Sequence, residues 1–239
     1  MKKIFLATLL ACFSVALFSQ ETVVYDKNVQ VRNVGSFRGI KVSSGITLYL
    51  KQGNAEAVAV SASEEEYRDK IKTVVENGIL KIYYDENWLK QIKSYNRKLK
   101  AYVTCKSLER LDGSAGASIK IDGKLTADKL SMDLSSGAVF TGEVSASSIN
   151  IDQSSGSVMS LSGTAEKVSV EGSSGSIFHG YSISTENCDA ETSSGAVIEI
   201  SANKQMSAKA SSGGAVRYKG NAGLTSVSTS SGGSVNKRG

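Results

Sequence analysis

A short serine- and glycine-rich block recurs through the second half of this chain and restricts its fold more than any other feature. Ser-Ser-Gly, or a close variant of it, returns at intervals of 18 to 21 residues. Its glycines are Gly116, Gly137, Gly156, Gly175, Gly195, Gly213 and Gly232. A matching block occupies residues 42–46. Self-similarity at a fixed period indicates a repeat architecture, in which each repeat forms one unit that stacks on the next.

Apolar residues stand at three fixed distances from the repeated glycine. Seven residues before it are Leu130, Ile149, Val168, Cys188 and Met206. Five residues before it are Leu111, Met132, Ile151, Val170, Ala190, Ala208 and Val227. Three residues after it are Ile119, Phe140, Met159, Phe178, Ile198, Val216 and Val235. Polar positions alternate with these, which is the period of a strand with one buried face and not the spacing of a helix.

The repeat therefore predicts an all-β fold, a single-stranded right-handed parallel β-helix of about seven turns over residues 111–239. Each turn should supply two or three short strands, and equivalent residues should stack at the strand spacing of about 4.8 Å. The left-handed hexapeptide helix is the alternative, but its six-residue apolar period is absent from the sequence. Because the chain holds 23 glycines and no proline, we expect the repeated glycine and serines to form the corners. Stacked serines there can hydrogen-bond along the coil.

Residues 20–110 should form the first turn or turns, together with an insertion at 61–107 that departs from the repeat. Residues 63–72 carry three glutamates near their start and predict a short helix, since acidic side chains favour a first helical turn. Asn77-Gly78 predicts a β-hairpin over 74–85, and residues 98–105 predict another strand. We interpret this β-rich block as an insertion or as a cap on the coil, since solenoids need their ends covered.

The first 19 residues have the pattern of a secretory signal peptide. Lys2 and Lys3 precede an uncharged, largely apolar run from Ile4 to Phe18, which is shorter than the roughly 20 residues of a membrane span. Without this segment the net charge falls from +5 to +3, which gives no argument for nucleic acid. We expect an exported protein without a transmembrane span, located in the periplasm, at the outer membrane or outside the cell. Leu-Leu-Ala-Cys at 9–12 also resembles a lipobox, which would place lipid on Cys12.

Three segments that follow resemble the opening of the head GIN domain family. They are Phe-Arg-Gly-Ile-Lys-Val at 37–42, Gly-Ile-Thr-Leu-Tyr-Leu-Lys-Gln-Gly at 45–53 and Val-Ala-Val at 58–60. The predicted helix, the hairpin and the Ser-Ser-Gly repeats come next in the same order, so the resemblance covers about residues 30–239. Members of this family are described as auto-transporter adhesins, are typical of Bacteroidetes and resemble secreted β-helices. The resemblance implies no catalytic residues.

The first candidate site is an acidic column four residues before the repeated glycine: Asp112, Asp133, Asp152, Glu171 and Glu191. Stacked carboxylates about 5 Å apart repel one another, and a cation such as Ca²⁺ would relieve the repulsion. A calcium site needs six to eight oxygen ligands, however, and these turns lack the dense Asp and Asn that would supply them. We interpret the column as a solvated outer face near Lys129 and Lys167, and we expect neither a bound metal nor a cofactor.

The second candidate is the column two residues after the glycine: Val139, Val158, Ile177 and Val197. If the position three after the glycine faces inward, this column must face outward. A flat stripe of β-branched side chains is a candidate contact surface for a protein or a glycan, with His179 and Arg217 in the adjoining polar column. The alternative is that the stripe reflects only the preference of β-branched residues for strands. No Ser-His-Asp arrangement is supported around His179, the single histidine.

The third candidate is a basic and aromatic stretch: Trp88, Lys90, Lys93, Tyr95, Arg97, Lys98 and Lys100. No acidic residue lies between positions 90 and 100. Such a stretch suits an anionic glycan, lipopolysaccharide or phosphate. The alternative is a solvated loop in which Trp88 packs against the coil.

Two cysteines, Cys105 and Cys188, follow the predicted signal peptide. Cys188 belongs to an apolar column, so both are expected to be small buried residues. They should not be joined, because about four turns, or ~19 Å, would separate them, whereas a disulfide needs Cα atoms within about 7 Å.

Three classes of function remain. We expect an exported, non-catalytic binding or adhesion scaffold of the cell envelope, because solenoids offer long and repetitive surfaces. Its partner would be an envelope glycan or protein, and the same stripe could mediate homo-oligomer formation. A polysaccharide-active β-helix enzyme would need a cleft built from long loops, for which repeats of 18 to 21 residues leave no room. A structural or sensing envelope component is the third class, and the sequence does not separate it from the first.

Overall fold

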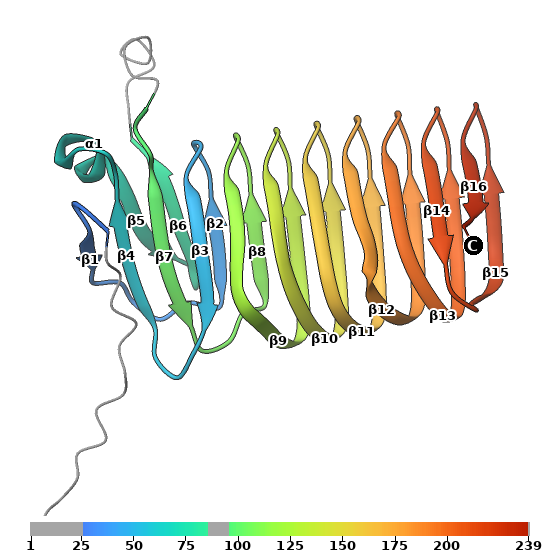
Figure 1. The fold of residues 1–239 in the computed structure, drawn as a ribbon, viewed down its shortest axis with the longest axis horizontal. Coiled ribbons are helices and arrows are strands. Elements are labelled where there is room, and N and C mark those ends of the chain that lie inside the picture. The colour runs from blue at the N-terminus through green and yellow to red at the C-terminus, as the bar shows by residue number, and fades with distance from the viewer. Residues whose placement is uncertain (1–25, 86–95, 239) are drawn as a thin grey trace, which may run out of the picture.

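The repeats fold into consecutive turns of a β-solenoid, which Figure 1 shows from the side. The computed structural model describes residues 26–85 and 96–238. The central strands are β9 (Ser118–Leu134), β10 (Val139–Gln153), β11 (Val158–Gly172), β12 (Ile177–Thr192) and β13 (Val197–Ala210). Each is 14 to 17 residues long and bends, so that its two halves lie on opposite walls of the coil. An all-β solenoid of about seven turns is thus confirmed, with one long bent strand per turn in place of several short ones.

Shorter strands extend both walls at the two ends of the coil. Toward the N-terminus are β1 (Gln30–Arg32), β2 (Gly39–Val42), β3 (Thr47–Gln52), β4 (Ala57–Ser61), α1 (Glu65–Asp69), β5 (Ile71–Glu76), β6 (Ile79–Tyr84), β7 (Lys100–Cys105) and β8 (Arg110–Gly113). Toward the C-terminus are β14 (Ala215–Lys219), β15 (Gly223–Thr229) and β16 (Ser234–Lys237). No helix in the described residues is long and apolar enough to cross a membrane. The predicted signal peptide at 1–19, with Cys12, lies outside the described residues.

The order of stacking along the coil differs from the order of the chain. β2 lies between β6 and β8, and β3 lies between β7 and β9, with all of these pairs parallel. Residues 98–105 do contain the predicted strand, β7, but β3 separates it from the first repeated turn. The antiparallel strands β4 and β5 reverse the chain and return it to the N-terminal side of β2 and β3.

The N-terminal end has the β-rich cap with one short helix that the sequence predicted. The helix is shorter than residues 63–72, but Glu65 and Glu66 do lie in its first turn. The hairpin is β5 and β6, joined through Asn77 and Gly78, both with positive φ. β4 pairs antiparallel with β7, and β1 pairs antiparallel with β4.

The three apolar columns form the core between the two walls. Neighbouring turns pair in register, so that Phe140 of β10 lies opposite Ile119 of β9 and Met159 of β11. All members of the columns are buried except two in the last turn. Val227 is 48% exposed and Val235 is half-buried, because no further turn covers them within the described residues. The assignment of Val227 to the core was therefore wrong, whereas Val235 still packs against the core.

The cysteines behave as the sequence predicted. Cys105 in β7 and Cys188 in β12 are both buried and free. Burial raises the pKa of the Cys105 thiol to about 11 and that of Cys188 to about 12, so both remain protonated at neutral pH.

A ladder of tight turns forms the corner at each Ser-Ser-Gly block. In the turn of residues 173–176, Ser174 and Gly175 both have positive φ, at 51° and 70°, which is typical of a type I′ turn. The backbone N–H of Ser176 donates to the carbonyl of Ser173 at 3.1 Å. The N–H of Gly175 donates to the carbonyl of Ser194 in the next turn, also at 3.1 Å. Backbone groups, rather than the side chains of the two serines that precede each glycine, thus link these corners. The serine after the glycine adds a side-chain bond in two turns, where Ser157 Oγ donates to the carbonyl of Leu134 and Ser176 Oγ to that of Gln153.

Ser174, the second residue of this turn, has a positive φ, so its position should tolerate few side chains. Ser174→Val should lower stability by about 1–2 kcal/mol, because a β-branched side chain clashes in the left-handed region. Ser174→Gly should stay within about 1 kcal/mol of the wild type, since relief of strain is offset by a more flexible unfolded chain. Thermal unfolding followed by circular dichroism measures both. Ser169→Val, within β11, is the control, and equal effects at the two positions would contradict the argument.

Substitutions at two adjacent residues of β10 should differ in their effect on stability, because one side chain points into the core and the next points to solvent. Ile151→Asp buries an unpaired carboxylate among apolar neighbours and should cost several kcal/mol. Asp152→Asn removes an exposed charge from the acidic column and should change stability by less than about 0.5 kcal/mol. Unfolding midpoints decide the matter, and a larger effect at position 152 would mean that the two faces are interchanged.

Candidate functional site

The outward valine stripe lies along one wall of the coil. Val139, Val158, Ile177 and Val197 pair with one another in register at the starts of β10 to β13. Val139 is 41% exposed, and the other three are half-buried at the surface. The structure therefore places this column outside the core, as the alternation predicted, and makes it continuous over four turns.

A charged cluster lies in the polar column beside the stripe. His179 of β12, Glu199 of β13 and Arg217 of β14 are paired neighbours on consecutive turns. The Nδ1 atom of His179 lies 3.0 Å from Glu199 Oε2, and the Nη1 atom of Arg217 lies 3.3 Å from Oε1. Burial by itself would raise the pKa of Glu199, but the contacts with His179 and Arg217 lower it below its ordinary value.

Two shallow depressions adjoin this cluster. The larger, of about 580 Å³, is lined by Ile121, Gly123, Thr141, Gly142, Glu143, Ser160, Leu161, Ser162, His179, Tyr181, Ser182 and Glu199. The smaller, of about 380 Å³, is lined by Tyr181, Glu199, Arg217, Lys219 and Arg238. The Nζ atom of Lys219 lies 4.7 Å from the centre of the Tyr181 ring, which is a cation–π contact. The surface thus combines hydroxyl groups, one aromatic ring and charges of both signs.

Sequence reasoning did not identify Tyr181, Lys219 or Arg238. Tyr181 lies where the register shifts between β11 and β12, after the pair Ser160 and His179. Beyond such a shift, residues at the same distance from the repeated glycine no longer lie opposite each other. The available signal was the interval from Gly175 to Gly195, which is one residue longer than the two intervals before it.

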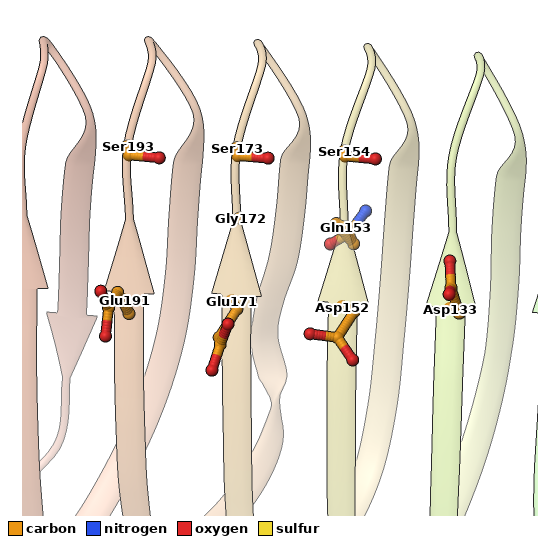
Figure 2. A pocket seen from close by; sticks show the side chains of 9 residues that line it. All are labelled: Asp133, Asp152, Gln153, Ser154, Glu171, Gly172, Ser173, Glu191 and Ser193. Atoms are coloured by element: carbon orange, nitrogen blue, oxygen red, sulfur yellow. The ribbon is translucent and has the colours of Figure 1, made fainter.

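The acidic column is in register, as predicted, and borders a shallow groove of about 270 Å³ (Figure 2). Four of its members, Asp133, Asp152, Glu171 and Glu191, are exposed. Asp112 is the exception. It is only 8% exposed, so its assignment to a solvated face was wrong.

Basic side chains stand at the two ends of the acidic column. Arg110 Nε lies 2.8 Å from Asp112, and Lys209 Nζ lies 3.4 Å from Glu191. Burial raises the pKa of Asp112, an effect that the charge and hydrogen bonds of Arg110 oppose. No group of three or more His, Cys, Asp or Glu side chains in the described part of the chain is arranged to hold a metal ion. The absence of a bound metal stays a prediction.

The basic and aromatic stretch is described only in part. Trp88, Lys90, Lys93 and Tyr95 lie outside the described residues. Of the rest, Arg97 stacks over Tyr84, with its Cζ atom 4.8 Å from the ring centre, and Lys100 pairs with Asp26 at 2.9 Å. Lys98 is exposed. Two of its three described cations therefore contact the protein itself.

The charge on Glu199 should contribute to stability in a pH-dependent way. Its pKa is lowered in the folded state, so the contribution is present above the ordinary pKa of glutamate and is lost as the pH falls through the lowered value. Glu199→Gln should destabilise the fold by about 1 kcal/mol at pH 7 and by much less below about pH 3. Denaturation at a series of pH values measures this difference. Glu143→Gln, which removes an exposed pair with Lys124, is the control and should have little effect at any pH.

Comparison with solved structures shows the same fold in Bacteroidetes. A crystal structure of a putative adhesin from Bacteroides fragilis aligns with a TM-score of 0.78 at 17% identity, over 88% of this chain and 96% of that one. A putative adhesin from Parabacteroides distasonis aligns with a TM-score of 0.70 at 16% identity, over the same shares. A putative lipid binding protein from the same organism aligns with a TM-score of 0.66 at 17% identity, again over 88% and 96%.

Family comparison covers most of the chain. No curated protein matches this chain. Residues 36–222 match the family model described as "putative auto-transporter adhesin, head GIN domain". The match includes the cap from β2 onward, the corners from Gly45 to Gly213 and all four residues of the valine stripe. The chain belongs to this head GIN domain family.

Proposed function

We propose that this protein is an exported, non-catalytic adhesion scaffold that binds an extended glycan of the cell envelope. The observation that carries the proposal is the outward valine stripe, four turns long, with the cluster of His179, Glu199 and Arg217 beside it. Equivalent positions on successive turns are about 4.8 Å apart, so the face presents similar groups at regular steps along the coil. Such a surface suits a partner that is itself elongated and repetitive.

The chemistry of this face favours a glycan over a protein partner. Apolar side chains suit the C–H faces of sugar rings, while Thr141, Ser160 and Ser182 offer hydroxyl groups around the larger depression. Tyr181 adds an aromatic ring, and the carboxylate and cations of the charged cluster can bond to sugar hydroxyls. A protein partner would instead be favoured by a wider apolar centre with a polar rim.

Three further observations support a scaffold rather than an enzyme. The Ser-Ser-Gly corners are tight turns whose backbones are linked from one turn of the coil to the next, so they build no wall around a cleft. The depressions on the described surface are shallow and open, whereas an enzyme that acts on a sugar encloses most of it in a cleft. The adhesin description of the family points the same way.

Export is the second part of the proposal. It rests on the basic and apolar pattern of the first 19 residues. Family membership is in keeping with it. The periplasm, the outer membrane and the exterior of the cell all fit. Mass spectrometry of the protein recovered from culture fractions tests it, and an intact N-terminus in the cytoplasm would refute it.

Binding should depend on the stripe. Val158→Lys with Ile177→Lys adds two charges to the candidate face at half-buried positions, so the fold should remain intact. Binding to an immobilised envelope polysaccharide fraction should weaken by about 10-fold or more, as burial of two unpaired charges would require. Asn150→Lys with Ser169→Lys adds the same charge to the opposite wall and serves as the matched control.

The outcomes of this experiment are distinct. Equal binding by both double variants would refute the choice of surface. Binding of the wild type to the envelope protein fraction alone would refute the choice of a glycan. Circular dichroism of each variant checks the fold, and unfolding of the Val158/Ile177 variant would show that these positions face inward.

A further inference from the structure

The last turn of the coil leaves two strand edges open. β15 pairs only with β13, and β16 pairs only with β14, among the strands of residues 26–85 and 96–238. Figure 1 shows both strands at the C-terminal end of the molecule. Their outer backbone N–H and C=O groups therefore face away from the coil, and such groups form a template for another strand.

The core of the coil is also open at this end. Leu224 and Val227 of β15 are 45% and 48% exposed. Their paired neighbours one turn earlier, Met206 and Ala208, are fully buried. The same inward positions thus pass from complete burial to half exposure within a single turn, because no further turn covers them within the described residues.

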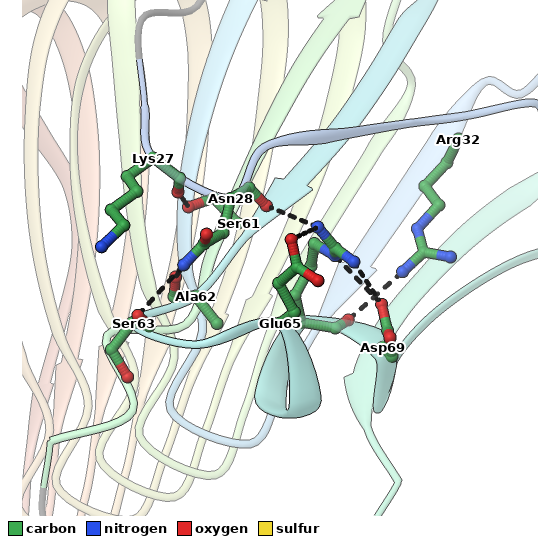
Figure 3. Close-up of polar contacts among 9 residues, drawn as sticks. Lys27, Asn28, Arg32, Ser61, Ala62, Ser63, Glu65 and Asp69 are labelled. Carbon is green, nitrogen blue, oxygen red and sulfur yellow. Dashed lines mark hydrogen bonds and ion pairs between the residues drawn. The ribbon is translucent and has the colours of Figure 1, made fainter.

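The N-terminal end is closed by comparison. There α1 and the antiparallel β1 cover the coil, and polar contacts hold them in place (Figure 3). Asn28 Nδ2 donates to the carbonyls of Ala62 and Ser63, at 3.3 and 3.1 Å. Arg32 Nη2 donates to the carbonyl of Arg68 at 3.2 Å. These contacts cover the N-terminal end of the coil, and no equivalent elements cover the C-terminal end within the described residues.

The two ends also differ in the features that normally prevent strand pairing. β1 has only three residues and carries Arg32, and β5 carries Lys72 and Glu76. β15 has seven residues with the sequence Gly-Leu-Thr-Ser-Val-Ser-Thr, and none of them is charged. Short length and charged side chains protect natural edge strands from association. β15 has neither.

We propose that two copies of this chain join through their C-terminal ends, with β15 pairing β15 and β16 pairing β16 in antiparallel fashion. A single extended peptide would cover one open edge and leave the other exposed. A second copy brings two edges at the same separation, together with its own Leu224 and Val227, so it covers both edges and the open core at once. Like pairs also match in length, since the strands have seven and four residues.

The charges of the last turn are compatible with this arrangement. In a centred antiparallel pair of β16 strands, Lys237 lies opposite Ser234 of the other copy, so the two lysines do not meet directly. Because the contact is isologous, the same surface of each copy is buried once two copies have joined, and the closed N-terminal ends point outward. The assembly therefore stops at a dimer. Under this symmetry the valine stripes of the two copies lie on the same side.

The mass in solution is the first test. Light scattering on the full chain, separated by size exclusion at a series of concentrations, should give twice the mass of one chain. Backbone amides of residues 223–229 should exchange slowly with deuterium in the dimer. A monomer at every concentration, or polymers of increasing length, would overturn the proposal.

Paired charge variants are the second test. Leu224→Lys with Val227→Lys places four charges in the contact between two copies and should weaken dimerisation by about 100-fold or more. Val31→Lys with Val74→Lys makes the same change at exposed positions of the closed end and should leave the dimer intact. Loss of the dimer only in the second variant would place the contact at the N-terminal end. If the first variant fails to fold, fast exchange of residues 223–229 in the wild-type protein would still refute the proposal.

Discussion

Backbone hydrogen bonding between parallel strands in register is the constraint on which this structure depends. It places each residue directly over its equivalent in the next turn, about 4.8 Å away, so a position must suit the same surroundings in every turn. The corners obey the same constraint, since the N–H of each corner glycine from Gly45 to Gly213 donates to a carbonyl of the neighbouring turn. Steric limits on residue type add to this constraint within the strands. At Gly163 of β11, for example, a Cβ would overlap the carbonyl of Val144 in the preceding turn.

Stacking in register also governs the electrostatics of the surface. Like charges in one column stand close together, as Asp133 and Asp152 do, and receive no neutralisation from within the column. Opposite charges in adjacent turns form pairs instead, such as Lys124 with Glu143 and Lys204 with Glu186. These pairs are exposed, so each contributes little to stability. Their greater effect is on the surface itself, where an apolar stripe can remain continuous because the charges lie in other columns.

A coil held together by contacts between neighbours has two ends with unmet interactions, and this chain treats them differently. At the N-terminal end, helix α1 and antiparallel strands replace the missing turn. At the C-terminal end the repeat simply continues into β15 and β16. The difference gives the molecule a polarity that its nearly uniform central turns lack. The proposed glycan-binding wall and the proposed dimer contact adjoin at β16, because Arg238, which follows that strand, lines the smaller depression. The substitutions that test the two proposals lie on different strands.

The sequence by itself determined the repeat, the burial of the three apolar columns, the turn positions and the outward direction of the valine stripe. These properties are local and are repeated, so each turn supports the interpretation of the others. Only the tertiary structure decided that β3 lies between β7 and β9, that Asp112 is buried beside Arg110, and that Val227 is exposed. The physical reason is that backbone edges are alike in every turn. Periodicity therefore does not specify which turn stacks on which, or which turn is left without a neighbour.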